Sequence, residues 1–347
     1  MTIVDAWYKK HAWLWLLWPL SVLLAFLARR RRVRLQGRHP AVSDALPVVV
    51  VGNITVGGTG KSPFVIALVK QLQAIGVRPA IVSRGFGGRA PRYPCVVDAA
   101  TTVEEAGDEA IMIRRSVSCP VVVDRQRVRA IEALRQSRTC DVIISDDGLQ
   151  HYAMPRVLEI VMLDGERLLG NGLCLPAGPL REPAARLQEV DYVVVNGDAR
   201  DARDTTLASG RFGRKAAMHL RPAAWVNLRS GARVDLQSLP LAGAGRLHAF
   251  AGIGNPQRFF ATVRALGYTP LCHPFPDHYR FGAQDLRFAT GNTVVMTQKD
   301  AVKCESFAEA DYWYLAVEAE LDAAFSAHLL QDICARITSA QSSKIQT

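Results

Sequence analysis

The sequence has few cysteines, and none of them stands in a pattern that would bind a metal or form a disulfide framework. Its 347 residues include seven cysteines at scattered positions, without a C-x-x-C pair. An odd, dispersed set of this kind argues against a zinc site and against a disulfide-stapled secreted domain, and for a reducing compartment. Internal repeats and low-complexity tracts are also missing, so we expect ordinary globular domains.

A cleavage site for a signal peptidase is missing after the one long apolar run. Ala12–Ala28 has 17 residues without a charge, and Arg29–Arg32 and Arg34 follow at once in place of small residues. As a helix this run extends about 25 Å, the short end of what spans a bilayer. Three tryptophans near one end suit a membrane interface, and the arginines suit the cytoplasmic face. We predict a membrane anchor at residues 1–34. The alternative is a buried core helix, and the choice between spanning and half-inserting stays open.

The chain has an excess of basic residues, with 42 Lys and Arg against 32 Asp and Glu and a net charge of +10. Such an excess indicates an anionic partner. Nucleic acid is one candidate, but the sequence lacks interleaved aromatic and basic residues and any recognisable nucleic-acid module. Much of the basicity also lies beside the anchor. We therefore predict no nucleic-acid partner, which leaves acidic lipid headgroups and phosphorylated substrates.

Short apolar runs alternate with amphipathic stretches from Leu46 onward. The runs are rich in valine and isoleucine, as expected for strands of a parallel sheet covered on both faces. Amphipathic stretches such as Phe64–Ile75 and Arg127–Gln136 fall between them. The expected strands are Val48–Val51, Ala80–Ser83, Val121–Asp124, Val142–Ser145, Ile160–Leu163 and Tyr192–Val195. This βαβ pattern predicts an α/β fold with a doubly wound, mostly parallel sheet.

The polar, charged stretch Asp198–Gly213 is typical of a linker or an exposed hairpin. A smaller α/β unit is expected after it, with a helix that follows Asn255-Pro256. Its expected strands are near Leu247–Ala251, at Thr293–Thr297 and at Tyr312–Val317. The length and the 49% of hydrophobic residues suit two cores. We place the first domain at 35–205 and the second at 206–347, with a C-terminal helix that could return to the first.

The strongest motif is VVVVGNITVGGTGKSPF, which begins at Val48. A valine strand leads into a glycine-rich turn, then Lys61 and Ser62, then a helix with Pro63 in its first turn, where proline is tolerated. Backbone N–H groups of such a P-loop bind phosphates, the lysine meets the β- and γ-phosphates, and the serine hydroxyl holds Mg²⁺. The strict pattern G-x-x-x-x-G-K-[ST] is not met, because a threonine occupies the first glycine position. A flexible loop before a helix is the alternative. The expected nucleotide-binding residues are Thr55, Gly57, Gly58, Thr59, Gly60, Lys61 and Ser62.

Two carboxylates end a second apolar strand, in DVIISDDGLQH at Asp141–His151. P-loop enzymes use an aspartate at this place to bind the metal directly or through water. Either Asp146 or Asp147 alone could be a turn residue ahead of Gly148. Two together beside a P-loop indicate the metal side of the site, without deciding which one binds directly.

Two further segments could supply or orient a base. In EEAGDE at Glu104–Glu109, Asp108 could cap the helix that follows, or it could accept the proton of an acceptor hydroxyl, as a kinase requires. FPDHY at Phe275–Tyr279 holds an Asp-His pair in a loop rich in proline and aromatic residues. A lone histidine is more often structural, but this pair could orient a base.

A membrane-tethered P-loop GTPase or ATPase switch is the main alternative function. A GTPase requires an N-K-x-D motif, and the segment Thr297–Asp300 has the wrong spacing. It also requires a glycine three residues after the strand-end aspartate, where Leu149 follows Asp146. The sequence therefore favours a phosphotransferase at a membrane.

Taken together, these segments resemble the tetraacyldisaccharide 4′-kinases, the lipid A 4′-kinases of Gram-negative bacteria. Eight blocks keep that family's order over most of the chain: GNITVGGTGKSP, SRGFGG at Ser83–Gly88, EAGDE at Glu105–Glu109, SDDGLQH at Ser145–His151, LPAGPLREP at Leu175–Pro183, AGIGNPQRFF at Ala251–Phe260, FPDHY, and TQKDAVK at Thr297–Lys303. Two positions depart from the pattern. Phe86 stands where the family often has tyrosine, which puts a hydroxyl contact there in doubt, and Gln298 stands where it often has glutamate.

The resemblance implies transfer of the ATP γ-phosphate to the 4′-hydroxyl of an acylated glucosamine disaccharide 1-phosphate, at the cytoplasmic face of the inner membrane. It implies Asp108 as the general base, His278 as its partner and Asp277 beside them. Lys61 and Ser62 would serve the nucleotide phosphates and Mg²⁺. The metal side would comprise Glu109, Asp146 and Asp147, with Gln150 and His151 close to the same site.

An acylated acceptor suits an anchored enzyme, because each buried CH₂ is worth ~0.8 kcal/mol and holds the substrate in the bilayer. Arg29–Arg32 would lie at the acidic headgroups of the inner-membrane lipid. Guanidinium groups pair with phosphate through two hydrogen bonds. The arginines that could receive the substrate's own phosphate are Arg84, Arg125, Arg127 and Arg181, although any one of them could be a solvated surface charge.

Overall fold

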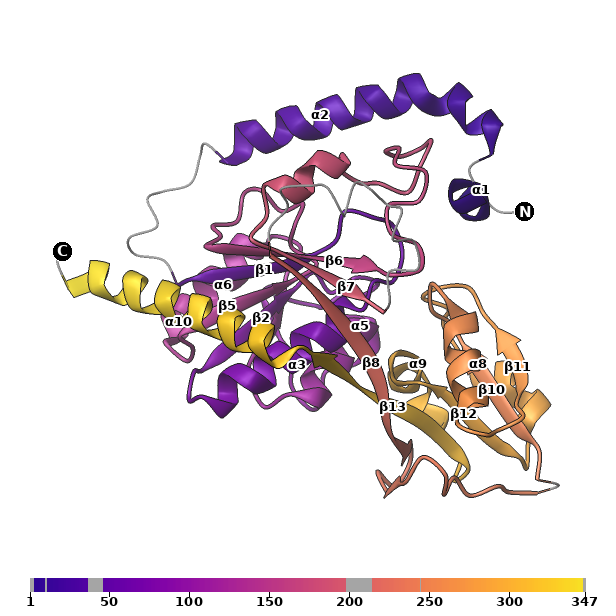
Figure 1. The fold of residues 1–347 in the computed structure, drawn as a ribbon. Helices are drawn as coiled ribbons and strands as arrows, with labels where there is room; N and C mark the ends of the chain where they lie inside the picture. Colours follow the sequence, from indigo (N-terminus) through magenta and orange to yellow (C-terminus); the bar gives the residue numbers. More distant parts are fainter. Residues whose placement is uncertain (1–2, 10, 37–45, 198–213, 244, 346–347) are drawn as a thin grey trace. The chain divides into compact units, whose positions relative to one another are not determined.

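A computed structural model describes residues 3–9, 11–36, 46–197, 214–243 and 245–345 of the chain (Figure 1). The predicted linker or hairpin at Asp198–Gly213 lies outside these residues. The described residues form two compact units, each made from separate stretches of the chain. Unit 1 comprises Met1–Arg84, Cys119–His219 and Glu320–Thr347, and unit 2 comprises Gly85–Ser118 and Leu220–Ala319.

This division differs from the prediction from sequence, which placed a single domain boundary after residue 205. The stretch Gly85–Ser118 belongs to unit 2, because its helix α5 (Asp108–Ser116) packs against α9 (Gln298–Cys304) of that unit. The C-terminal helix α10 (Ala323–Ile345) belongs to unit 1, where Tyr192 donates a hydrogen bond to its Asp332 at 2.6 Å.

Unit 1 is built on a parallel sheet with the strand order β8-β7-β6-β1-β5-β2-β4. The strands are β1 (Val48–Gly52), β2 (Pro79–Ser83), β4 (Val121–Val123), β5 (Val142–Asp146), β6 (Leu158–Asp164), β7 (Tyr192–Asn196) and the first part of β8 (Arg214–Asn227). Every residue of β1, β5 and β6 is buried, which explains why most of their residues are apolar. The six strands expected for this sheet and its parallel pairing are confirmed.

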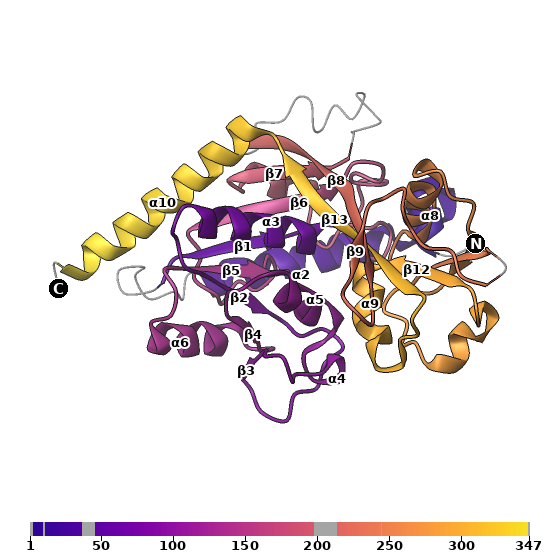
Figure 2. The same cartoon turned by 90° about the horizontal axis from the view of Figure 1, so that it is seen from below.

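Two predicted helices pack against this sheet, α3 (Lys61–Ala74) and α6 (Arg127–Ser137) (Figure 2). Both are amphipathic. The buried side chains of α3, among them Phe64, Leu68 and Leu72, recur every three or four residues and face the sheet. A short 3₁₀ helix, η3 (Ala184–Gln188), precedes β7.

The N-terminal apolar run is helical, in α1 (Ile3–Lys9), η1 (Ala12–Leu17) and α2 (Trp18–Gln36). Among the described residues, one helix is long and apolar enough to cross a membrane, the 24 residues Ala12–Leu35. Most of its large apolar side chains are exposed, which does not fit a buried core helix.

A narrow face of the N-terminal helices contacts the rest of unit 1. Ser21 Oγ donates to the carbonyl oxygen of Cys174 at 2.8 Å and accepts from the N–H of Ala177 at 3.0 Å. The indole of Trp7 donates to the carbonyl oxygen of Pro176 at 3.0 Å. Buried Leu14 packs beside it, so this face is fixed to the loop that precedes η3.

In unit 2 the strands follow the order β11-β10-β12-β13-β8. Its strands are β10 (Leu247–Ala251), β11 (Leu271–Pro274), β12 (Thr293–Thr297), β13 (Tyr312–Leu321) and the last part of β8, which β9 (Arg233–Val234) joins in antiparallel pairing. The remaining elements are β3 (Cys95–Val96), α4 (Val103–Ala106), α8 (Pro256–Ala265), η4 (Ala283–Ala289) and η5 (Glu305–Phe307). The strands expected at 247–251, 293–297 and 312–317 and the helix after Asn255 are confirmed.

Candidate functional site

The P-loop turn connects β1 to α3 in unit 1. Gly60 is the N-cap of α3 and has a left-handed backbone, with φ of 85°. A side chain there would be strained, and its Cβ would lie 2.5 Å from Asn196 Nδ2, so only glycine fits. The amide of Asn53 donates to the carbonyl oxygen of Thr55 at 2.8 Å and holds the turn from inside. The first turn of α3 contains no acidic side chain, so its free N–H groups can receive an anion.

Three more of the residues expected to bind the nucleotide in this turn are buried. Thr55, Thr59 and Ser62 are buried, with exposed fractions of 3%, 2% and 8%. At Gly58 an added Cβ would meet no atom within 4 Å, so this part of the turn faces open space. The alternative of a flexible loop does not fit a turn that is held by side-chain hydrogen bonds and buried threonines.

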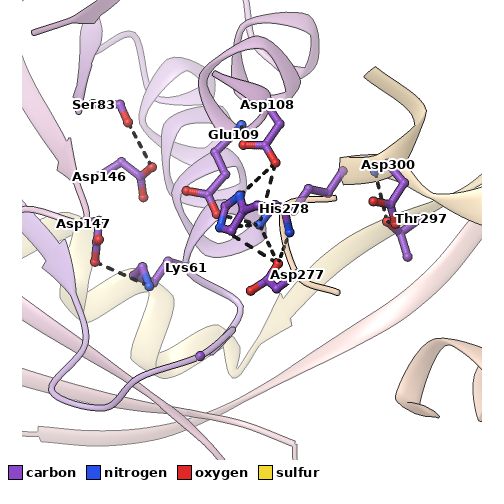
Figure 3. A network of polar contacts seen from close by, with 12 residues as sticks. Lys61, Ser83, Asp108, Glu109, Asp146, Asp147, Asp277, His278, Thr297 and Asp300 are labelled. Atoms are coloured by element: carbon purple, nitrogen blue, oxygen red, sulfur yellow. Dashed lines mark hydrogen bonds and ion pairs between the residues drawn. The ribbon is translucent and has the colours of Figure 1, made fainter. Parts of the chain in front are cut away.

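The two strand-end aspartates lie beside the P-loop. Asp146 is the last residue of β5 and pairs in register with Val51 of β1. Its carboxylate is fully buried and accepts a 3.5 Å hydrogen bond from Ser83 Oγ (Figure 3). Asp147 follows with φ of 48°, a conformation that is uncommon outside glycine and often found at functional sites.

Asp147 lies between two cations. Its carboxylate is 3.5 Å from Lys61 Nζ (Figure 3). A guanidinium nitrogen of Arg181 lies 3.6 Å from the same carboxylate. Burial opposes ionisation of Asp147, but the charges of Lys61 and Arg181 outweigh it and hold the pKa of this carboxyl below its usual value. The P-loop lysine is therefore paired with the expected metal-side carboxylate.

The oxygen atoms of this region suit a magnesium–nucleotide complex. The described residues contain no group of three or more His, Cys, Asp or Glu side chains that could hold a metal ion by themselves. Mg²⁺ is commonly bound through one or two carboxylates together with substrate phosphates and water. Two carboxylates beside a P-loop serine provide such a partial set, so Asp146, Asp147 and Ser62 fit the ion.

Arg127 is buried rather than exposed, and its contacts are with the backbone of its own unit. It is 1% exposed, and its guanidinium donates to the carbonyl oxygens of Asp124, Asp146 and Asp147 at 3.2, 3.1 and 3.5 Å. Burial lowers its pKa to about 10. A direct contact with substrate phosphate is therefore not available to Arg127, which instead holds the turn that carries the two aspartates.

The remaining residues expected near substrate in unit 1 differ in their surroundings. Arg84 and Arg125 are exposed. Gln150 donates to the carbonyl oxygen of Asn53 at 3.1 Å, so the structure brings it against the P-loop turn. Burial and the charges of nearby arginines lower the pKa of His151 to about 4, so its ring is neutral at pH 7. The arginines concerned are Arg127, Arg84, Arg31 and Arg156.

Asp108 in unit 2 begins α5 but does not cap it. The N-cap is Gly107, with φ of 85°, where a Cβ would lie 2.3 Å from the carbonyl oxygen of Phe86. Asp108 is 5% exposed. Its Oδ1 accepts from the N–H of Glu109 at 2.9 Å, and its Oδ2 is 3.1 Å from Nδ1 of His278 (Figure 3). The structure thus brings together the carboxylate and the histidine that were expected as base and partner.

His278 is held by its backbone and by an aromatic neighbour. Its φ is 58°, and its N–H donates to Oδ1 of Asp277 at 3.0 Å. The ring of Phe86 packs on the imidazole, with centroids 4.8 Å apart. Phe86 stands where the family often has tyrosine, and it contacts the histidine through its ring.

Asp108 and His278 each shift the pKa of the other. Burial works against the charge of Asp108, but the hydrogen bond from His278 and the charge of Lys299 outweigh it, so the pKa of Asp108 is lowered. The hydrogen bond to Asp108 raises the pKa of His278, against burial and the charge of Lys299. Asp108 therefore stays ionised at neutral pH, with Oδ2 facing the imidazole of His278.

Lys299 is the residue of this cluster that sequence reasoning missed. Its Nζ lies 3.1 Å from Glu109 Oε1 and 3.4 Å from Asp277 Oδ1. Burial disfavours its charge, but the surrounding carboxylates outweigh burial and raise the pKa of Lys299. It stands inside the block TQKDAVK, which was the available signal. Glu109, expected on the metal side, belongs to unit 2 and pairs there with this lysine.

Comparisons with known proteins agree over nearly the whole chain. The family model LpxK, described as tetraacyldisaccharide-1-P 4′-kinase, matches residues 13–334. The tetraacyldisaccharide 4′-kinase of Pseudomonas putida strain W619 is 49% identical over 318 residues, 91% of each chain. That of Azotobacter vinelandii strain DJ is 48% identical over 325 residues, 93% of this chain and 94% of the relative. The crystal structure of "apo" form LpxK from Aquifex aeolicus in complex with ATP has 26% sequence identity and a TM-score of 0.74, and the match covers 92% of this chain and 98% of that one.

Proposed function

The chain belongs to the tetraacyldisaccharide-1-P 4′-kinase family, and from this membership we propose which residues carry out the reaction. The chain is an ATP-dependent kinase that phosphorylates the 4′-hydroxyl of a tetraacyldisaccharide 1-phosphate, a precursor of lipid A. The observation that carries the proposal is the buried carboxylate of Asp108, 3.1 Å from His278 Nδ1. A switch protein does not need such a base, whereas a kinase with a hydroxyl acceptor does.

Unit 1 supplies the nucleotide half of the reaction in this proposal. The N–H groups of the P-loop turn and of the first turn of α3 bind the phosphates of ATP, which the Aquifex aeolicus structure supports as the donor. Lys61 exchanges its contact with Asp147 for the β- and γ-phosphates. When bound, Mg²⁺ neutralises charge on the phosphate oxygens. The residues that would hold it are Ser62, Asp146 and Asp147, with Glu109 as the further candidate that the resemblance implies.

Unit 2 supplies the base. The 4′-hydroxyl oxygen attacks the γ-phosphorus, the new P–O bond forms as the bond to the β–γ bridging oxygen breaks, and ADP leaves. The hydroxyl proton passes to the carboxylate of Asp108, and His278 orients that carboxylate through its hydrogen bond. The strained backbone of His278 supports the assignment, because residues held at positive φ gather at functional sites.

The acceptor brings the enzyme to a membrane in this proposal. The exposed apolar side chains of Ala12–Leu35 enter the inner membrane, and Arg29–Arg32 lie at the anionic headgroups of its cytoplasmic face. The contacts of Ser21 with the loop at Cys174–Ala177 favour a helix that lies in the membrane surface over one that crosses it, because a crossing helix would leave that loop. The residues proposed to contact the sugar or its phosphate are Arg84, Arg125, Arg181, Gln150, His151 and Asp277.

A pair of variants in the two units tests the assignment. Lys61→Ala is expected to abolish transfer of γ-phosphate and to weaken ATP binding in calorimetry. His278→Ala is expected to lower kcat and to leave ATP affinity within about twofold, because base chemistry and nucleotide binding use different residues. Near-normal kcat in Lys61→Ala would show that the nucleotide site lies elsewhere.

A further inference from the structure

The ammonium group of Lys299 has no part in the proposed reaction, yet it lies close to the proposed base and to the charged and histidine side chains around it. Lys299 is the second residue of α9, and α9 packs against α5, whose first two residues are Asp108 and Glu109. Nζ lies 3.1 Å from Glu109 Oε1, 3.4 Å from Asp277 Oδ1 and 3.4 Å from His278 Nε2. Oδ2 of Asp108 is 4.0 Å away.

The number of donors equals the number of close acceptors. A protonated lysine has three N–H donors and no acceptor. One N–H is therefore available for each of Glu109, Asp277 and His278. With all three satisfied, the ammonium is fixed in position rather than free to rotate among solvent contacts.

A lysine that can only donate also decides which nitrogen of His278 carries the proton. The hydrogen bond from Lys299 requires a lone pair on Nε2, so in the neutral ring the proton lies on Nδ1. Nδ1 faces Oδ2 of Asp108 at 3.1 Å and donates to it. In the opposite tautomer, Nε2–H would point at the ammonium and the lone pair of Nδ1 at the carboxylate, so both contacts would become repulsive.

We propose that Lys299 is a positioning residue for the Asp108–His278 pair, which holds His278 in its Nδ1–H tautomer and keeps the ring against the carboxylate. Lys299 also separates three carboxylates, since Asp108, Glu109 and Asp277 all lie within 4.0 Å of its nitrogen and would otherwise repel one another. The inference rests on the proposed role of Asp108 as the base. It adds a residue that acts through the histidine and does not itself contact the reacting atoms.

The kinetic test compares three lysine variants. Lys299→Met keeps the length of the side chain and removes its donors, and Lys299→Arg keeps the positive charge. Lys303→Met is the matched control, because Lys303 lies one turn further along α9 and pairs with Asp300 at 2.6 Å. We expect Lys299→Met to lower kcat about 10–100-fold, as for residues that orient a ligating histidine, with KM for ATP within about twofold. Lys299→Arg should recover part of this loss, and Lys303→Met should keep its kcat per folded molecule while it loses stability.

The spectroscopic test reads the tautomer directly. ¹⁵N NMR of the imidazole nitrogens in the full-length protein in micelles, with the His278 signals assigned by their loss in His278→Gln, reports which nitrogen carries the proton. The wild type should show Nδ1–H, and Lys299→Met should show Nε2–H or a mixture. Above the raised pKa of His278 the ring is neutral, and an Nε2–H ring in the wild type under that condition would overturn the proposal. The same tautomer in the wild type and in Lys299→Met would overturn it as well.

A double-variant cycle separates action through the histidine from a general effect on the fold. In a His278→Ala background, Lys299→Met should cost no more than about threefold in kcat, because the ring that it positions is gone. Full multiplication of the two losses would overturn the proposal. Asp108→Asn is measured in parallel. If it loses kcat while Lys299→Met does not, the role of Lys299 is wrong and the base assignment stands. If Asp108→Asn keeps its kcat, the base assignment itself is wrong.

Discussion

Replacing Asp108 by asparagine separates the two roles that its sequence position allows. A capping residue contributes ~1 kcal/mol to stability and leaves the chemistry of the folded protein intact. In the structure Gly107 is the N-cap of α5, so replacing Asp108 does not remove the cap. Asparagine can still accept the hydrogen bond that Oδ1 receives from the N–H of Glu109 at 2.9 Å. The change therefore removes the charge and the basicity that face His278, together with one of the two hydrogen bonds that the carboxylate accepts.

The expected effect on rate is large and the effect on stability is small. Loss of a general base lowers kcat ~10²–10⁴-fold, which at ~1.36 kcal/mol per factor of ten raises the barrier by about 2.7–5.5 kcal/mol. Asparagine has one acceptor oxygen, so it can keep the hydrogen bond from Glu109 N–H or the one from His278 Nδ1–H, but not both. Loss of one of them costs about 1 kcal/mol of stability, a shift in Tm of about 2 °C.

The assay is single-turnover transfer from labelled ATP to the lipid acceptor in micelles, with Tm measured on the same preparation. Asp98→Asn is the matched control in the same unit, because Asp98 is exposed and makes only local turn contacts with Ala100 and Thr101. It should keep wild-type kcat. If Asp108→Asn keeps near wild-type kcat with an intact fold, the proton acceptor lies elsewhere, with Asp147 and Asp277 the next candidates.

Three further predictions concern the anchor, a glycine and a histidine. Leu23→Asn with Phe26→Asn, on the exposed side of α2, should weaken sedimentation with membranes and raise KM for the lipid acceptor, with KM for ATP unchanged; equal membrane binding would show that another surface docks. Gly107→Ala should destabilise the protein by about 1–3 kcal/mol in chemical denaturation, because φ is 85° and the new Cβ would meet the Phe86 carbonyl; wild-type stability would contradict this. The NMR signals of His151 should not titrate between pH 5.5 and 8, because its pKa is lowered to about 4. The folded state then binds fewer protons than the unfolded state, so stability from this residue falls as pH drops from about 6.5 toward 4, and a midpoint near 6.5 would contradict the assignment.

The strands of unit 1 could be predicted because a strand that is buried on both faces consists mostly of apolar residues, and such a run is visible in the sequence. Val48–Gly52 is a continuous apolar run, and Val142–Asp146 begins with one before it ends in Ser145 and Asp146. The long strand β8 (Arg214–Asn227) was missed for the opposite reason. In its first half only Met218 is buried, and Arg214 and Lys215 are charged. Pro222 stands near the middle of the strand, so neither a buried run nor a clean alternation is visible.

The chemistry of the site could be predicted where a motif combines residue type with spacing. Lys61 and Ser62 follow a glycine-rich turn, and Asp108 and His278 stand in short blocks that resemble a known family. Lys299 stands in the block TQKDAVK, but the block alone does not tell which of its two lysines has a role. The proposed role of Lys299 comes from three acceptors that the fold of unit 2 brings to one point. Glu109 lies on α5, and Asp277 and His278 lie in the FPDHY loop. Arg127 was misread for a related reason, since sequence does not tell a buried guanidinium from an exposed one.

The most direct test of the account is transfer of labelled γ-phosphate from ATP to a tetraacyldisaccharide 1-phosphate by the purified full-length chain in detergent micelles, with the site of phosphorylation determined by ³¹P–¹H NMR of the product. The account predicts one new phosphate per acceptor, on the 4′-oxygen, with transfer that requires Mg²⁺ and is lost in Lys61→Ala. Hydrolysis of ATP without a phosphorylated lipid, or phosphate at another position of the disaccharide, would contradict it.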